Sequence, residues 1–166
     1  VAVVRGASLG GASGTANTSR FMPGTAPTVI GGGGITGSST ISIVPWMVGD
    51  NRGAAYFGNS FITITNPIVG GLRPLAEAEF TATFAANNNV GISANTTQGA
   101  AAINALRILG GNLTLTGLLT LDSGAMLITN APTISGTGIQ LGSSGTQEGV
   151  FGIFGTADRT ATRKFK

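Results

Sequence analysis

Short runs of alternating apolar and polar residues, separated by frequent turn residues, make up the sequence from Asn104 to Ile139. A strand places successive side chains on opposite faces, so the apolar positions are expected to face one core and the threonines the other side. Glycines such as Gly110 and Gly111 recur too often for a helix, and each would cost about 1 kcal/mol inside one. The region therefore predicts a ladder of short strands. Its apolar positions are Leu113, Leu115, Leu119, Leu121, Leu127 and Ile134, and its threonines are Thr114, Thr116, Thr120 and Thr129.

Two all-β arrangements accommodate such a ladder: a β-sandwich and a parallel β-helix, or β-solenoid. A sandwich is built from hairpins, whose strongest short signals, Asn-Gly and Asp-Gly, occur nowhere in the chain. A β-solenoid tolerates loops of uneven length, because each rung needs only an apolar residue stacked on its neighbour. Uneven spacing is found here, since strand-like runs begin near Leu113, Met126, Ile139 and Val150. We therefore predict an all-β chain folded as a parallel β-helix with irregular loops.

The first half of the chain contains further strand-like runs, between loops rich in Gly, Ser and Thr. At most one short helix is expected, near 74–80, because Pro74 suits the first helical position and helix formers follow it. The segment from Gln98 to Leu109 is ambiguous, since its alanines and leucines favour a helix. The strand-like sequence after it favours a strand over Ala105 to Leu109. The other expected strands lie at Val1 to Val4, Thr28 to Ile30, Thr40 to Met47 and Phe61 to Thr65.

The composition indicates where the protein is located relative to the cell. Only 9% of the 166 residues are charged, against about 25% in a typical domain, so Thr, Ser, Asn and Gly must cover the surface. This composition favours a secreted or cell-surface protein. Cysteine is absent, so strand pairing and stacking must stabilise the fold without disulfides. No apolar run approaches the 18 residues of a membrane-spanning helix, so no membrane span is expected.

The basic residues are concentrated in a tail at 159–166, which holds four of the nine lysines and arginines. Residues 1–158 carry five arginines and six acidic residues, a formal charge of 5 − 6 = −1. The body of the protein is therefore not basic, which argues against a nucleic-acid partner. We expect the tail to be solvated, with a tether for polysaccharide or lipid headgroups as the alternative.

Strand-like sequence runs close to both ends of the chain, which begins on Val1 and stops on the basic tail. We expect residues 1–166 to form a single β-solenoid segment of a longer secreted chain. The ends of such a segment expose unpaired backbone groups and apolar rungs that a neighbouring copy can cover. The expected assembly is a homo-oligomer or a filament joined through solenoid ends.

The chemistry available to the chain is narrow, because it contains neither His nor Cys. This excludes a histidine base, a thiol nucleophile and the commoner zinc sites. Glu77 and Glu79 lie close in sequence, but at the start of a helix they would point apart, as a solvated first turn rather than a catalytic pair. Asp50-Asn51 and Asn87 to Asn89 are predicted to be turn residues rather than calcium ligands. We predict no enzymatic activity, no cofactor and no metal.

Aromatic residues offer one candidate ligand site. Together with Phe61, Trp46 and Tyr56 would form a platform on which a sugar ring could stack, with polysaccharide as the partner. Against this, Trp46 follows Pro45 within an apolar run, which is typical of a core residue.

Four segments together resemble a known class of bacterial protein. They are Val3 to Gly11 (VVRGASLGG), Gly31 to Asp50 (GGGGITGSSTISIVPWMVGD), Asn59 to Phe80 (with NSFIT and GLRPLAEAEF) and Ile103 to Thr129 (INALRILGGNLTLTG and LTLDSGAMLIT). In these segments the chain resembles the large planctomycete-type surface proteins that carry autotransporter-associated β-strand repeats. The resemblance implies a secreted, repetitive, right-handed β-helix displayed outside the cell, and it implies no catalytic residues. In that family further strand repeats follow, where this chain has the basic tail.

These observations predict an extracellular structural protein. It would be a β-solenoid subunit or segment of a fibre, matrix or surface layer, assembled end to end. The alternative is an adhesin-like passenger module that binds carbohydrate or a surface along one flank, with Trp46 and Tyr56 as its ligand-binding residues.

Overall fold

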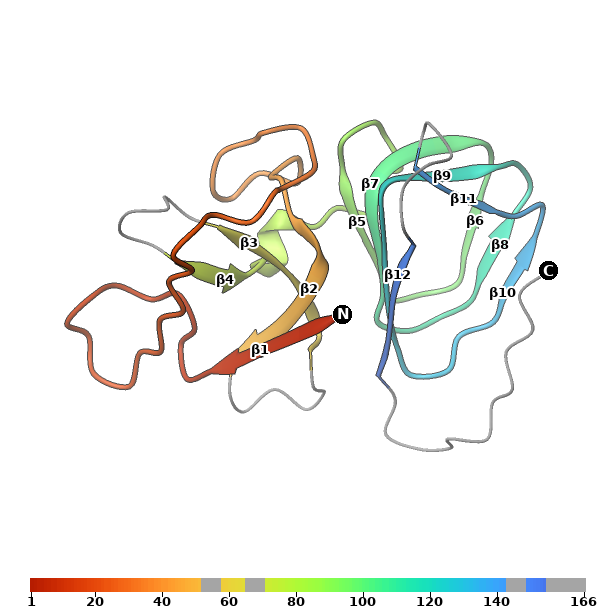
Figure 1. Cartoon of the computed structure of the whole chain (residues 1–166). Helices are drawn as coiled ribbons and strands as arrows, with labels where there is room; N and C mark the ends of the chain where they lie inside the picture. Colours follow the sequence, from red (N-terminus) through yellow and green to blue (C-terminus); the bar gives the residue numbers. More distant parts are fainter. Residues whose placement is uncertain (52–57, 65–70, 143–148, 155–166) are drawn as a thin grey trace.

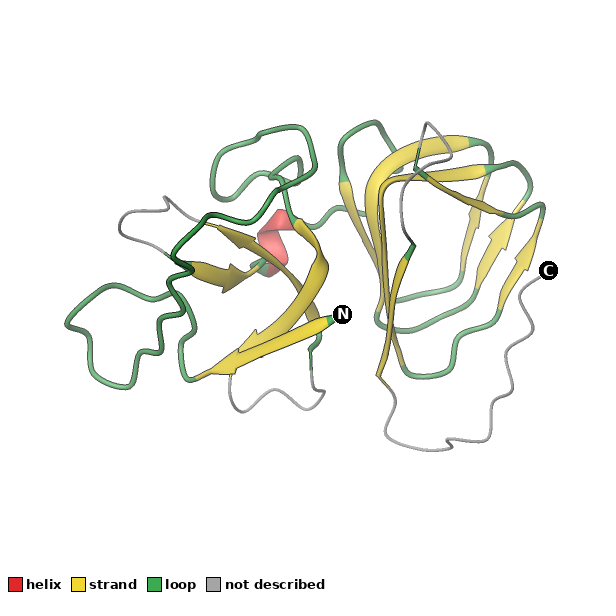
Figure 2. Ribbon diagram, viewed as in Figure 1, coloured by secondary structure: helices red, strands yellow, loops and turns green. Residues whose placement is uncertain are grey.

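The protein is built almost entirely of β-strands and the loops that connect them (Figure 1, Figure 2). The computed structural model describes residues 1–51, 58–64, 71–142 and 149–154. Strands β1 to β4 form a first group and strands β5 to β12 a second, with a short 3₁₀ turn between them in the chain. The predicted all-β class is confirmed. Within the described ranges, no helix has the length and hydropathy needed to span a membrane.

The first group is a four-stranded sheet of mixed direction, in the order β1-β2-β3-β4. Strands β1 and β2 are parallel, whereas the pairs β2/β3 and β3/β4 are antiparallel, unlike the parallel ladder predicted for the whole chain. The connections 52–59 and 65–71 are shorter than the dozen or more residues that a parallel crossover needs. The bounds are β1 (Ala2–Gly6), β2 (Val44–Asn51), β3 (Ser60–Ile64) and β4 (Leu72–Pro74).

The second group consists of two sheets in which every strand pair is parallel. One sheet has the order β6-β8-β10, and the other has the order β5-β7-β9-β11, with β12 also paired to β9. The bounds are β5 (Asn89–Ile92), β6 (Thr96–Gln98), β7 (Ala101–Ile108), β8 (Leu113–Leu115), β9 (Leu119–Thr129), β10 (Ile134–Gly136), β11 (Ile139–Leu141) and β12 (Val150–Phe154).

Successive strands of the second group stack in register, so that side chains from distant positions lie side by side. In the β6-β8-β10 sheet, for example, Thr97, Thr114 and Ser135 are neighbours across the strands. All three are exposed. We call β5 and β6 the first rung of this stack, and β10, β11 and β12 the last rung (Figure 1).

The interior of the stack is apolar, and four leucines predicted to face it, Leu113, Leu115, Leu119 and Leu121, are almost completely buried there. The prediction was wrong for Leu127, which faces the first group. Three residues of β9, Asp122, Ser123 and Gly124, lie opposite the single residue Asn104 of β7. This irregularity marks a corner of the stack, and beyond it the alternation of inward and outward side chains restarts. Gly124 has a φ of +68°, which favours glycine. Beyond the corner, Met126 and Ile128 point inward instead.

A second apolar cluster joins the two groups of strands. Val48 and Phe61 of the first group, together with Ile43 just before β2, pack against Ala105 and Leu127 of the second. The two groups of strands thus pack against each other, with β2 lying against β9.

The short helix predicted near 74–80 is a single 3₁₀ turn, η2 (Glu77–Glu79), preceded by strand β4, which ends at Pro74. The ambiguous segment is a strand, as favoured: β7 covers Ala101–Ile108. The strand expected at Thr28 to Ile30 is reduced to an isolated bridge between Ile30 and Ile43.

Candidate functional site

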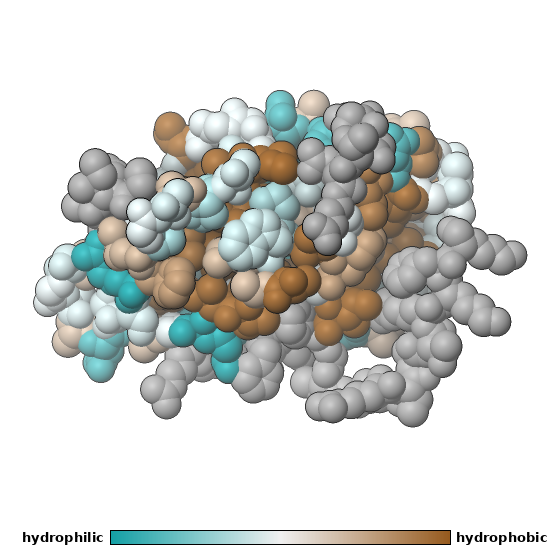
Figure 3. All heavy atoms as spheres, in the orientation of Figure 1, coloured by the Kyte–Doolittle hydropathy of each residue, from teal (hydrophilic) through white to brown (hydrophobic). Residues whose placement is uncertain are grey.

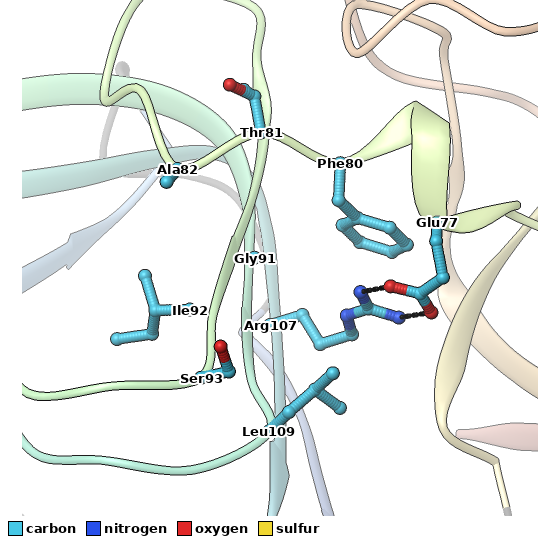
Figure 4. A pocket seen from close by; sticks show the side chains of 9 residues that line it. All are labelled: Glu77, Phe80, Thr81, Ala82, Gly91, Ile92, Ser93, Arg107 and Leu109. Atoms are coloured by element: carbon cyan, nitrogen blue, oxygen red, sulfur yellow. Dashed lines mark hydrogen bonds and ion pairs between the residues drawn. The ribbon is translucent and has the colours of Figure 1, made fainter.

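A hollow of ≈ 170 Å³ lies between the 3₁₀ turn and strands β5 and β7 (Figure 4). Its wall combines one ion pair, one aromatic ring, two hydroxyl side chains and several aliphatic groups. The lining residues are Glu77, Phe80, Thr81, Ala82, Gly91, Ile92, Ser93, Arg107 and Leu109.

Arg107 is the central group of this hollow. It belongs to β7, between the buried apolar residues Leu106 and Ile108, and is itself only 2% exposed. Its guanidinium lies over the ring of Phe80, with the central carbon 3.5 Å from the ring centroid, a cation–π geometry. Phe80 is in turn packed against Phe61, with ring centroids 6.2 Å apart. These contacts fix the position of the guanidinium.

Glu77 neutralises Arg107 from the side of the 3₁₀ turn (Figure 4). The two terminal nitrogens of Arg107 donate to the two carboxylate oxygens of Glu77, at 2.9 Å and 2.6 Å. The hydrogen bonds from Arg107 hold the pKa of Glu77 below its ordinary value; partial burial opposes this shift, and the positive charge of Arg107 adds to it. The side chain of Glu77 is nevertheless 76% exposed.

The third nitrogen of Arg107, Nε, is buried and has no hydrogen-bond partner. Leaving a buried donor unsatisfied costs about 1–3 kcal/mol, so such groups call for an explanation. The guanidinium therefore holds a spare donor in addition to the two that Glu77 occupies.

Glu79 points away from Glu77, as predicted, but it is not solvated. Its carboxylate is completely buried and receives two hydrogen bonds of 2.6 Å from Arg73. The backbone N–H groups of Gly37 and Ala76 also donate to it, each at 2.8 Å. Burial raises the pKa of Glu79, but these hydrogen bonds outweigh it, so the pKa lies below its ordinary value. Glu79 therefore has a structural role.

The aromatic platform predicted from the sequence is not assembled by the described residues. Trp46 is 44% exposed on β2, so it is not the core residue that its apolar surroundings favoured. Pro45 and Met47, its neighbours in the strand, are the buried ones. Tyr56 lies outside the described residues.

The polar residues weighed as calcium ligands are engaged within the protein. Asp50 is buried and accepts hydrogen bonds from Arg5 Nε and from the Gly58 N–H, at 2.8 Å and 2.6 Å. Asn89 is buried in β5, where its side-chain oxygen accepts a 2.7 Å hydrogen bond from Asn104. Asn87 is a turn residue with a φ of +67°. Among the described residues, no three acidic, His or Cys side chains gather as a metal-ion group would require.

Sequence reasoning missed Arg107 as a site residue. A signal was present, because a lone arginine within the apolar run ALRIL must bury its charge or disturb the strand. The sequence did not indicate which residue pairs with Arg107, since Glu77 lies thirty positions away.

A second feature is the apolar surface of the last rung. Ile134, Ile139, Leu141 and Phe151 are only partly buried against the core, and Ile153 is 43% exposed. In Figure 3, hydrophobic residues gather over the part of the molecule where β12 lies.

Comparison of the chain with family models, with curated proteins and with solved structures finds no match.

Proposed function

We propose that the protein is an extracellular structural protein whose strands β5 to β12 form a right-handed β-solenoid that joins a second copy through its last rung. The all-parallel pairing of both sheets in this part of the chain supports the solenoid. Parallel connections are right-handed in about 98% of cases, which supports the handedness. The low proportion of charged residues supports an extracellular matrix or surface layer as the setting.

The observation that carries the proposal is the loss of cover at the last rung. Leu119 and Leu121 of β9 are fully buried, whereas their register partners on β11, Ile139 and Leu141, are only partly buried. The same increase in exposure separates another pair of register partners, since Ile128 of β9 is buried and Ile153 of β12 is exposed. Exposed apolar surface of this kind is typical of an interaction surface.

The first rung differs, because other parts of the chain cover it. Thr81 pairs in parallel with Val90 of β5, and Phe84 packs against the core cluster that contains Val90. The backbone carbonyl of Ser39 also accepts a hydrogen bond from the N–H of Asn89. Among the described residues, one end is covered and the other is not. This favours a closed pair joined through two last rungs, because an open filament needs two different surfaces that match.

The predicted kinship with surface proteins that carry autotransporter-associated repeats agrees with this function. No family model matches the chain, so the kinship stays a prediction.

Light scattering over a range of protein concentrations, together with electron microscopy, tests the proposal. We expect the wild-type chain to form end-to-end pairs as the concentration rises. Ile153→Lys places a charge on the last rung and should leave a monomer. Leu118→Lys is the matched control, because Leu118 is 44% exposed but lies outside the last rung. A wild-type chain that stays monomeric at high concentration would contradict the proposal.

A further inference from the structure

The hollow beside Arg107 has features that a structural role does not use. A charged side chain that is almost completely buried retains an unpartnered donor there, and its counter-ion is largely exposed. We propose that this hollow binds a uronate, a sugar that carries a carboxylate, and that Glu77 is a tethered occupant which the ligand carboxylate replaces on Arg107.

The recognition geometry for a carboxylate is already present. A guanidinium presents its N–H groups in a rigid fork that matches a carboxylate in two parallel hydrogen bonds. Glu77 makes such a pair, at 2.9 Å and 2.6 Å. The stack on Phe80 and the burial within β7 hold the fork in place, so a ligand would not have to order it.

The two partners differ in their freedom to move apart. Arg107 is fixed in the middle of a strand, whereas Glu77 is the first residue of a 3₁₀ turn and is mostly exposed. Glu77 can therefore swing into solvent while Arg107 stays. Exchange of one carboxylate for another leaves the positive charge of Arg107 paired in two charge-assisted hydrogen bonds.

The remainder of the wall suits a hydroxylated ring. Thr81 and Ser93, which both carry a hydroxyl group, are among the residues that line the hollow, and Arg107 Nε is a donor without a partner. Leu109, which lies beside Arg107, provides aliphatic surface for the C–H face of a sugar (Figure 4). The hollow of ≈ 170 Å³ is roomy, since one water needs about 10–15 Å³ of such volume.

Arg107 and Glu77 are the charged residues that line the hollow, so the site is neutral when the pair is closed. The 3₁₀ turn holds the carboxylate of Glu77 near Arg107, at an effective concentration on the order of millimolar. The carboxylate of a ligand must compete with it. Removing the charge of Glu77 should therefore strengthen uronate binding, whereas it would weaken a site that used Glu77 as a ligand-binding group.

Titration calorimetry with galacturonate, galactose and oligogalacturonate tests this site in the full chain. We expect Glu77→Gln to bind galacturonate about tenfold more tightly than the wild type, and galactose to bind to neither. The Nε–H proton resonance of Arg107 should shift when galacturonate binds. Tighter binding of oligogalacturonate than of galacturonate would identify an acidic polysaccharide as the source of the carboxylate, and equal binding a free uronate.

Arg107→Lys in the Glu77→Gln background keeps the charge but removes the fork, and it should abolish the gain. If that variant does not fold, Glu77→Gln alone still decides the question. A Glu77→Gln chain that binds no galacturonate, or that binds galactose equally well, would overturn the proposal.

Discussion

The first and last rungs of the parallel group are built from similar apolar residues but have different surroundings. Val90 and Ile92 of the first rung are buried, with Thr81 paired to Val90 and Phe84 packed against their cluster, whereas Ile153 of the last rung is exposed. Alternating apolar residues therefore specify a strand that can stack on another strand. Whether that strand becomes core or interface depends on the residues that pack against its outer side.

The largest expected difference is between two register partners, Leu121 and Leu141. Leu121→Ala removes a fully buried side chain and should lower the free energy of unfolding by about 2–5 kcal/mol. Leu141→Ala removes a partly buried one from the last rung, and we expect a loss below about 1 kcal/mol at low protein concentration, where no partner covers it. Urea denaturation of both variants measures this difference. Equal losses would show that the last rung is as well covered as the middle of the stack.

A smaller effect is expected at the covered end. Phe84→Ala should lower the free energy of unfolding by about 1–2 kcal/mol, since full burial of a phenylalanine contributes about 1.5–3 kcal/mol and Phe84 is only partly buried. The substitution also uncovers the first rung, so both ends can then associate. Electron microscopy should show assemblies longer than pairs. The same pairs as in the wild type would argue that Phe84 is not what closes this end.

The smallest effect concerns the Glu77–Arg107 pair, which ties the 3₁₀ turn to β7. The pKa of Glu77 is lowered in the folded state, from an ordinary value of 4.5, so the stabilisation is fully present above pH 4.5 and is lost as the pH falls through the lowered pKa. Because Glu77 is largely exposed, the loss should be below about 1 kcal/mol. Acid titration of stability in the wild type and in Glu77→Gln measures it. Identical acid profiles would show that the pair contributes nothing to folding.

The sequence predicted the straight parts of the ladder well, because period-two alternation alone decides which side chains are buried there. Leu113, Leu115, Leu119 and Leu121 follow this rule. Leu127 does not, because the alternation restarts at the corner opposite Asn104, and the position of a corner depends on the rung stacked beside it.

The antiparallel pairs of the first sheet were missed for a related reason. The connections 52–59 and 65–71 contain neither Asn-Gly nor Asp-Gly, the strongest short signals of a hairpin. The site at Arg107 likewise joins residues from β7 and the 3₁₀ turn, and tertiary packing brings them together.

Hydrogen–deuterium exchange of the wild-type chain at low and high protein concentration is the decisive test of association through the last rung, because it locates the contact between copies. If copies join through their last rungs, amide exchange in β10, β11 and β12 will slow as the concentration rises, while exchange in β5 stays the same. Exchange that is independent of concentration throughout the last rung would contradict the account.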